Sequence, residues 1–276
     1  MRLQRGDGAA EVGYAVGPQG TALAHLYQRD PCRVLFPDEE PGDPPQAVFV
    51  TMSGGLADGD RLRLKVQAGA AARATATTQA AEKIYRASAR AEDCAIDVTL
   101  DVAEGATLAW LPQETILFEG ARLRRRTRVD VAPGARLLAC EMVVLGRVAS
   151  GERFTSGLLL DSWRVNRGGR LVWADALRLD GKPPAVAGFG DATAVALALY
   201  VADNDSGQLA AGREQIERAC SLAPGLKAGV TAVNGLLLAR FLGDPLPVRR
   251  GLASWLANMR TVCLDLPPRL PRVWHV

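Results

Sequence analysis

The sequence is poor in histidine and has no closely spaced pair of cysteines, and each shortage excludes a class of site. Two histidines among 276 residues are too few for a histidine-rich metal centre. The five cysteines form no CxxC pair, and their odd number argues against a disulfide framework. Four of them stand in apolar or mixed surroundings, as buried free thiols do, which indicates a reducing, cytoplasmic compartment. The cysteines are Cys32, Cys94, Cys140, Cys220 and Cys263.

A strong net charge is also missing. The formal net charge is only +3, too small to indicate an electrostatic nucleic-acid binder. Only four of the 33 basic residues are lysines, so arginine carries the positive charge, and arginine favours carboxylate pairs and protein interfaces. The one basic cluster predicts the solvated face of an edge strand, with a partner-binding patch as the alternative. It consists of Arg122, Arg124, Arg125, Arg126 and Arg128.

Long hydrophobic runs are absent. The N-terminal stretch has no apolar core of signal-peptide length. The longest apolar run, residues 192–202, is too short to cross a bilayer. Hydrophobic residues make up 48% of the chain and charged residues 23%, which argues against disorder. We therefore expect a folded cytoplasmic protein that interacts with no membrane.

Motifs of the common enzyme classes are missing as well. The chain contains no GxSxG, HExxH, Walker GxxxxGK[ST] or helix-opening GxGxxG sequence. The glycine-rich residues 53–60 precede a strand pattern rather than a helix, so they do not support a phosphate loop. Lys83 and Tyr85 form a conceivable acid–base pair of the kind that β-helical lyases use. No histidine or second catalytic group accompanies them, so we expect no enzyme; a β-solenoid carbohydrate-active enzyme using Lys83, Tyr85 and Arg86 is the alternative.

The chain does contain a repeated unit of two short strands around a glycine turn. The four units span residues 61–79, 95–114, 127–141 and 158–175. Their turn glycines, each in a Val-x-x-Gly sequence, are Gly69, Gly105, Gly134 and Gly168. Glycine supplies the positive φ that tight hairpin turns need, and alternating residues in the first strands indicate β-structure. The pattern predicts a mainly β fold of stacked, solenoid-like antiparallel or mixed sheets rather than a closed barrel.

Residues 110–118 (WLPQETILF) form an apolar run that contains an amide and a carboxylate, Gln113 and Glu114. Pro112 has no backbone donor, so it ends or breaks a strand ladder at this point. The polar pair is therefore expected at a strand end or bulge, where side chains are aimed rather than packed. A carboxylate among apolar neighbours is costly to bury unless something binds it. The alternative is that Glu114 points to solvent from a turn.

Aligning the four turn glycines brings polar residues from different strands near one level of the stack. Seven residues after each glycine stand Ala76, Pro112, Glu141 and Asp175, and the next pairs in the first two units are Thr77-Thr78 and Gln113-Glu114. Carboxylates and carboxamides in this arrangement are suited to line a hydrated channel or a weak divalent-ion path. The alternative is that strand ends are polar because they meet solvent.

Beyond residue 180 the pattern changes, and a few helices are expected towards the C-terminus. Residues 182–184 (KPP) break the chain, and residues 192–201 predict a buried strand. Helical spacing appears at 206–219, whereas 229–242 fits either a helix or two short strands. No boundary marks an independent second domain, so we expect residues 1–276 to form one domain.

Residues 248–264 predict a further helix with one apolar stripe, which we assign to the core, with an interface as the alternative. The stripe consists of Leu252, Trp255, Leu256, Met259, Val262 and Cys263.

Three groups of these residues together resemble the UreD family of urease accessory proteins, also called UreH. The first group is Gly54, Gly55, Gly59 and Asp60; the second is Thr77, Thr78, Gln79, Lys83, Tyr85 and Arg86; the third is the segment 110–118 with Trp110, Pro112 and Gln113. Their order and spacing also match. The resemblance runs from about residue 54 to the C-terminus and is weaker over the first fifty residues.

The resemblance implies a non-catalytic maturation factor with a largely β fold. Proteins of this family are scaffolds for nickel insertion into apo-urease. They bind the accessory protein UreF, which recruits the nickel-carrying GTPase UreG, and nickel passes through an internal polar tunnel. No tightly bound cofactor is implied, only nickel in transit, and scattered oxygen ligands suit an ion that must be released. The residues carried over as lining this path are Asp60, Thr78, Glu114, Glu141 and Asp175.

Overall fold

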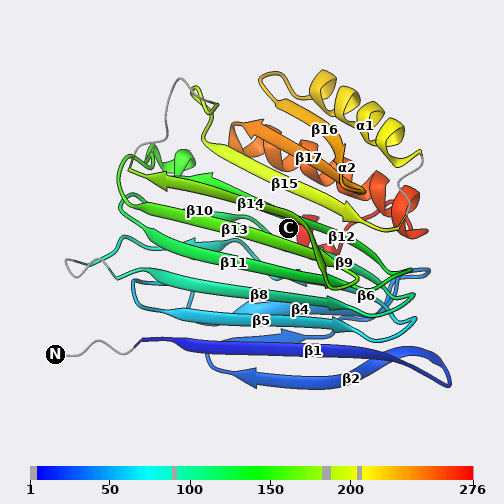
Figure 1. Ribbon diagram of the computed structural model, residues 1–276. Helices are drawn as coiled ribbons and strands as arrows, with labels where there is room; N and C mark the ends of the chain where they lie inside the picture. Colours follow the sequence, from blue (N-terminus) through cyan, green and yellow to red (C-terminus); the bar gives the residue numbers. More distant parts are fainter. Residues whose placement is uncertain (1–4, 89–91, 182–187, 204–206, 276) are drawn as a thin grey trace.

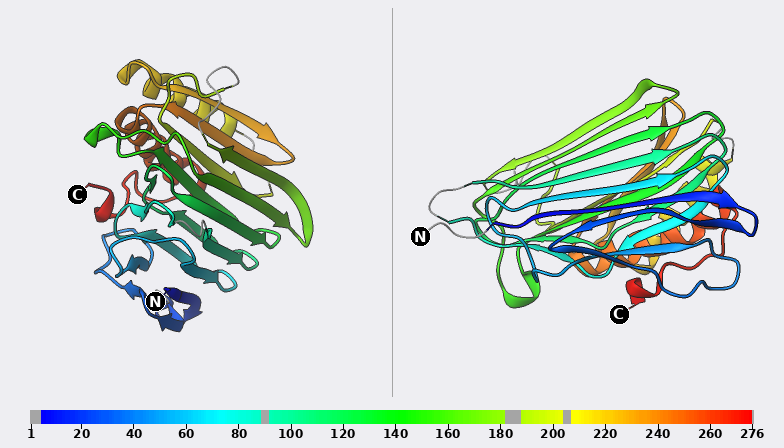
Figure 2. Two further views of the ribbon diagram at one scale, coloured as in Figure 1. Left: turned by 90° about the vertical axis from the view of Figure 1, so that its left-hand side faces the viewer. Right: turned by 90° about the horizontal axis from the view of Figure 1, so that it is seen from below.

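The computed structural model describes residues 5–88, 92–181, 188–203 and 207–275, and in this part of the chain two β-sheets pack face to face (Figure 1). Figure 2 shows the sheets as two layers, with the helices on the outer side of the second layer. Over these residues the protein is therefore mainly β, with sheets that do not close into a barrel and two α-helices near the C-terminus, as predicted.

The first sheet has seven strands among the described residues, in the order β14-β13-β11-β8-β5-β1-β2. Its inner strands run parallel to one another, and β2 and β14 add antiparallel edges. The strands are β1 (Asp7–Gly17), β2 (Gly20–Arg29), β5 (Arg61–Ala68), β8 (Cys94–Val102), β11 (Arg122–Val131), β13 (Leu158–Arg167) and β14 (Arg170–Asp180).

The second sheet has ten strands in the same described part of the chain. Eight of them follow the order β16-β17-β15-β12-β9-β6-β4-β3, and the short strand β10 joins β12 to β7. The strands are β3 (Cys32–Leu35), β4 (Gln46–Thr51), β6 (Arg73–Thr78), β7 (Glu82–Ile84), β9 (Thr107–Leu111), β10 (Thr115–Leu117), β12 (Arg136–Leu145), β15 (Ala194–Val201), β16 (Lys227–Val233) and β17 (Leu236–Gly243).

The first three predicted repeats are arches between the two sheets rather than hairpins. Strands β5, β8 and β11 stack in parallel in the first sheet, and their successors β6, β9 and β12 stack in parallel in the second. Corresponding residues of successive units lie side by side, as when Val66 pairs with Leu100 and Leu100 with Val129. The predicted solenoid-like stacking is confirmed. The predicted hairpins are wrong except in the fourth unit, where β13 and β14 are antiparallel neighbours.

The reason for the arches lies in two different burial patterns. Strand β8 alternates between buried and half-buried residues, whereas every residue of β9 is buried. The first sheet leaves its outer face to water, whereas the second packs on one face against the first sheet and on the other against the helices and the C-terminal segment (Figure 2). A strand that is apolar on both sides belongs in the covered sheet, so the chain crosses over at each turn.

The turn glycines match the prediction in three units. Gly105, Gly134 and Gly168 have φ values of 66°, 69° and 56°. In the first unit the left-handed residue is Ala71, with φ 55°, instead of Gly69. Gly69 is required by space, because a Cβ atom there would stand 2.9 Å from the backbone oxygen of Tyr14.

The prediction that the arginine cluster lies on an edge strand is wrong. Its strand, β11, runs between β8 and β13 in the middle of the first sheet. Arg124, Arg126 and Arg128 do point to solvent, but Arg125 is buried. On the solvent face Arg122 and Arg126 pair with Asp93 and Asp97, each at 2.7 Å. Pairs of this kind let a parallel sheet expose one face to water, which parallel sheets rarely do.

Helices α1 (Gln208–Leu222) and α2 (Pro245–Leu264) pack on the second sheet, and the short 3₁₀ turns are η1 (Val148–Ser150) and η2 (Arg272–His275). The predicted helix 248–264 is confirmed as α2, which starts three residues earlier at a proline. Its stripe belongs to the core, as predicted, since Trp255 and Met259 are fully buried; only Val262, at 41% exposed, does not. Within the described residues, neither helix is long and apolar enough to span a bilayer.

The other C-terminal predictions are also largely confirmed. The predicted buried strand 192–201 is β15, and the segment 229–242 forms two strands, β16 and β17. The helix predicted at 206–219 is α1; Ser206 lies outside the described residues, as do residues 182–184. Four cysteines are buried free thiols, and Cys220 is half-buried.

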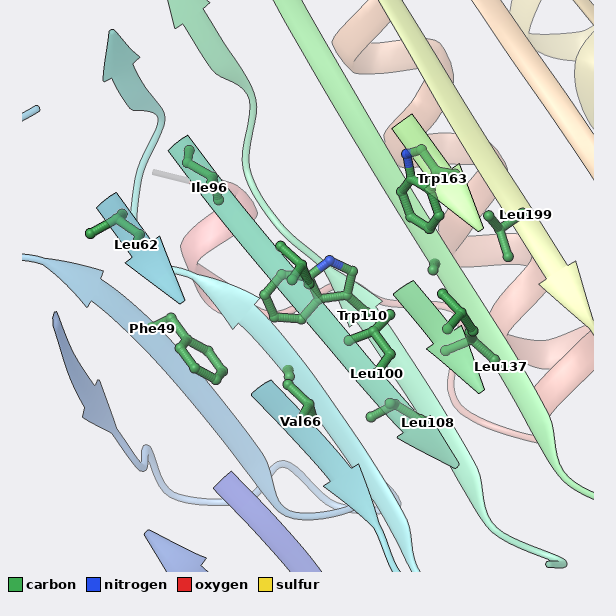
Figure 3. Close-up of a cluster of buried hydrophobic side chains, with 14 of the residues drawn as sticks. Phe49, Leu62, Val66, Ile96, Leu100, Leu108, Trp110, Leu137, Trp163 and Leu199 are labelled. Carbon is green, nitrogen blue, oxygen red and sulfur yellow. The ribbon is translucent and has the colours of Figure 1, made fainter. Parts of the chain in front are cut away.

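The space between the sheets is filled by apolar side chains from both layers (Figure 3). Leu62 and Leu100 come from the first sheet, and Phe49 and Trp110 from the second. The rings of Phe49 and Trp110 meet edge to face, with centroids 5.6 Å apart. This core surrounds the polar groups described next.

Candidate functional site

The predicted break at Pro112 is confirmed. Strand β9 ends at Leu111 and β10 resumes at Thr115. Leu108 pairs with Leu137 of β12 and Thr115 with Val143, so the register against β12 shifts by one residue between the two short strands. The intervening residues are therefore free to aim their side chains away from the ladder.

Gln113 and Glu114 anchor the second sheet to the C-terminal segment. The buried Gln113 donates its backbone N–H to Thr78 Oγ1 at 2.8 Å and its side-chain amide to the carbonyl of Val273 at 2.8 Å. Glu114 forms an ion pair with Arg249 of α2, whose guanidinium also lies over the ring of Trp274. Glu114 is thus engaged with the helices outside the second sheet.

The glycine and tyrosine motifs pack against each other. Tyr85 donates its hydroxyl to the carbonyl of Gly54 at 2.9 Å, and its ring meets Phe118 edge to face at 5.1 Å. Gly55, at φ 145°, has no room for a side chain, since a Cβ atom would stand 2.7 Å from the Tyr85 ring. Gln79 donates its backbone N–H to Phe49. These contacts give the motifs a structural role.

The carbohydrate-active alternative finds no support in this geometry. The hydroxyl of Tyr85 is engaged with a backbone carbonyl, and the Lys83 and Arg86 side chains are exposed. None of the three residues lines either of the two interior cavities described below.

Asp60 closes the turn at the start of β5. Its Oδ1 accepts the backbone N–H of Gly6 at 2.7 Å, and its Oδ2 accepts that of Ala57 at 2.8 Å. Both oxygens of this buried carboxylate are therefore engaged with backbone donors. Gly59, at φ 83°, belongs to the same turn. Asp60 lines neither interior cavity.

A buried ion cluster lies between the sheets. The Arg125 guanidinium of β11 donates to both oxygens of Asp161, at 3.2 Å from Nε and 2.7 Å from Nη2, and to Thr115 Oγ1 at 2.8 Å. It also forms an ion pair with Glu141 of β12. Glu141 in turn accepts the indole N–H of Trp163 through Oε2 at 2.8 Å. Arg125, Glu141 and Asp161 are 7%, 6% and 8% exposed.

The electrostatics of this cluster are set by burial. Burial raises the pKa of Asp161 above its ordinary value, although the Arg125 guanidinium works in the opposite direction. Glu141 Oε1 faces Arg125 but makes no hydrogen bond of regular geometry. Two carboxylates share one cation here, so the interior holds an excess of negative charge.

Two cavities adjoin the cluster, and Glu141 lines both. The larger, of about 500 Å³, is also lined by Asp161, Trp163 and Asp175. The smaller, of about 50 Å³, is also lined by Arg125 and by Thr78, Glu82, Gln113 and Thr115. Asp175 pairs with the exposed Arg240 at 2.5 Å, so the larger cavity reaches the surface there. Glu141 is thus common to the two cavities, whereas Thr78 lines only the smaller one and Asp175 only the larger one.

Glu82 is an acidic residue of this region that the sequence reasoning missed. Its Oε2 accepts the hydroxyl of Thr51 at 2.6 Å, and burial raises its pKa to about 7. A usable signal exists in the sequence: in a strand of period two, Glu82 shares a face with the apolar Ile84, which is fully buried.

The sequence reasoning also missed Arg125 and Asp161, and for Arg125 the reason is related. Arg125 was counted in a run of surface arginines, yet its alternating neighbours Leu123, Thr127 and Val129 are all buried. The face of the strand, rather than the length of the arginine run, decides its environment.

The fold and site together define a two-layered β-protein with a buried ion cluster between its sheets. Comparison with known proteins adds the family. The sequence matches the family described as UreD urease accessory protein over residues 6–275. It is 43% identical to the urease accessory protein UreD of Magnetococcus marinus, covering 92% of this chain and 89% of that protein. It is 41% identical to the UreD of a Methylobacterium species, covering 99% and 96%.

The chain therefore belongs to the UreD family of urease accessory proteins, as its motifs indicated. Membership gives it a role in urease maturation.

Proposed function

We propose that the chain is a non-catalytic scaffold that passes nickel to apo-urease through the polar region between its sheets. The observation that carries this proposal is the buried cluster of Arg125, Glu141 and Asp161 with a cavity on either side. Buried charge of this kind costs folding free energy unless it is compensated, and this cost is the physical ground for assigning the cluster a function.

The proposed path runs from Asp175, past Glu141, to Thr78 and Glu82, all of which line the two cavities. Asp60 and Glu114, which the family resemblance suggested, are left out because their carboxylates are held by backbone donors and by Arg249. Oxygen ligands along such a path suit Ni²⁺ that binds weakly and moves on.

The metal-binding chemistry also favours transit over storage. Among the described residues, no group of three histidine, cysteine or acidic side chains is placed to hold a metal ion. Burial raises the pKa of the Cys32 and Cys263 thiols to about 12, so neither is a thiolate ligand at neutral pH. We expect no tightly bound cofactor.

The partners in this proposal are apo-urease, UreF and, through UreF, the GTPase UreG, all in the cytoplasm. Nucleic acid and membranes are not part of it. Support comes from family membership and from the small net charge of +3.

The test is urease activation in a reconstituted system with Glu141→Gln. This substitution keeps the shape of the side chain and an oxygen for the Trp163 N–H, but removes the charge next to both cavities. We expect activation to fall by about tenfold or more, the scale on which loss of a metal-site interaction acts, while UreF still binds.

Glu114→Gln is the matched control, because it neutralises a carboxylate of the same type outside both cavities. Its activation should stay near the wild-type level. Wild-type activation by Glu141→Gln would refute the proposed path, and equal losses in both variants would mean that structure rather than transit is affected.

A further inference from the structure

The cation at the centre of the interior cluster is an arginine, although its surroundings resemble a site for a metal ion. Four oxygen atoms face the guanidinium: both carboxylate oxygens of Asp161, Glu141 Oε1 and Thr115 Oγ1. These oxygens come from three strands, β10, β12 and β13, and Arg125 itself comes from a fourth, β11. Two carboxylates and a hydroxyl, completed by water, match the oxygen ligands of a six-coordinate divalent ion.

Arginine supplies a cation at this position at any physiological pH. Its guanidinium keeps its charge, and its planar fork fits the carboxylate of Asp161 through two parallel hydrogen bonds. A divalent cation that enters either cavity therefore meets a positive charge and finds two oxygens of Asp161 already engaged. Glu141 Oε1 is engaged in the ion pair with Arg125 as well, so the four oxygens become free for an ion only when the guanidinium leaves.

We propose that Arg125 is an internal gate that occupies a latent divalent-cation site formed by Glu141, Asp161 and Thr115. The inference rests on the proposed path and deepens it, because it assigns the point at which ion passage is controlled. With the guanidinium in place, the site is closed to metal. When the guanidinium withdraws, the same oxygens bind the ion.

Passage through the cluster is then an exchange of one cation for another. Glu141 and Asp161 line the 500 Å³ cavity, which has room for a hydrated ion beside the cluster before the exchange. The cavity on the Arg125 side is much smaller, about 50 Å³, and is the narrower part of the proposed path. Exchange of the guanidinium for the ion leaves Glu141 and Asp161 with a cationic partner throughout.

The proposal is tested by nickel titration of the full chain by calorimetry, comparing the wild type with Arg125→Gln. We expect Arg125→Gln to bind one Ni²⁺ per chain at least about tenfold more tightly than the wild type, because the charged competitor is gone and two carboxylates remain. The added substitution in Arg125→Gln/Glu141→Gln should abolish the gain. Arg126→Gln, which removes the next arginine on the exposed face of the same strand, should behave like the wild type.

Equal nickel affinity in the wild type and Arg125→Gln would overturn the proposal. Binding that survives in Arg125→Gln/Glu141→Gln would do so as well, because the metal would then be bound elsewhere. If Arg125→Gln does not fold without metal, Arg125→Gln/Asp161→Asn carries the test, since it keeps the net charge of the cluster. It should bind nickel more tightly than the wild type, because the guanidinium is gone and Glu141 keeps its charge.

The result is independent of urease activation. Tight binding by Arg125→Gln together with full activation by Glu141→Gln would support the latent site and refute the conduit. Lost activation by Glu141→Gln without any gain in nickel affinity for Arg125→Gln would leave the conduit standing and remove the gate.

Discussion

Two adjacent arginines on β11 occupy opposite faces of the first sheet and have opposite environments. Arg126 lies on the outer face, where its side chain is 57% exposed and pairs with Asp97 at 2.7 Å. Arg125 lies on the inner face, where its side chain is 8% exposed and is held by Asp161, Glu141 and Thr115. The same residue type at consecutive positions therefore forms a surface ion pair on one face and partners buried carboxylates on the other.

The difference shows what each face requires of a charge. On the outer face, water already stabilises both partners, so an ion pair adds little and mainly keeps the parallel sheet soluble. On the inner face, water is excluded, and each charge depends on its partners. The inner cluster is consequently the part of the molecule where a single substitution should have the largest effect.

The largest effect is expected for Arg125→Met. Removing the guanidinium leaves Glu141 and Asp161 buried without a cation, which should cost about 3–5 kcal/mol of unfolding free energy. The matching change on the outer face, Arg126→Met, should cost less than about 1 kcal/mol. Urea unfolding followed by circular dichroism measures both values.

A triple variant separates charge from packing at this position. Arg125→Met/Glu141→Leu/Asp161→Leu removes all three charges and should recover most of the stability lost in Arg125→Met. If the triple variant is as unstable as the single one, the loss comes from disturbed packing between the sheets, and the contrast between the two faces is not electrostatic.

A smaller effect is expected from Glu82, which borders the small cavity. Its folded-state pKa of about 7 lies above the ordinary value of 4.5, so folding favours the protonated form. Below the ordinary pKa both states are protonated and there is no penalty. As pH rises from 4.5 to about 7, only the unfolded state ionises, and stability falls by up to about 3 kcal/mol.

Glu82→Gln should remove this decline, since the amide cannot ionise. The measurement is the unfolding free energy of both proteins at several pH values between about 3.5 and about 8, which extends about one unit beyond the expected window on each side. The contradicting outcome is an unfolding free energy that changes with pH in the same way in the wild type and in Glu82→Gln. Glu82 would then be ionised inside the fold, and its pKa would not be raised.

Much of the fold could be predicted because its signals are local. Pro112 ends β9, and the apolar stripe around Trp255 and Met259 predicts α2. The arches were predicted as hairpins because a glycine turn looks the same in both. The distinguishing signal was the change from alternation in β8 to continuous apolar residues in β9, which reports whether a sheet is covered on one face or on two.

The interior site was predictable only in part. Glu141 and Asp175 were found by aligning the turns, and both line the larger cavity. Glu114 came from the same alignment and Asp60 from the family resemblance, but their carboxylates are held by Arg249 and by backbone donors. Which oxygen is engaged and which is free depends on contacts between distant segments, and spacing along the chain does not report these contacts.

The smallest effect is expected on the outer face, where it completes the contrast with Arg125. Asp97→Asn removes the partner of Arg126, and the pair should contribute only about 0.2–1 kcal/mol at low salt. Because both side chains are reached by solvent, this contribution should vanish near 1 M salt, where the Debye length is about 3 Å. The cost of Arg125→Met should change little over the same salt range, since its partners are buried. Unfolding titrations of both variants at low and high salt check this, and a strong salt dependence for the Arg125→Met loss would mean that the inner cluster is hydrated like the outer face.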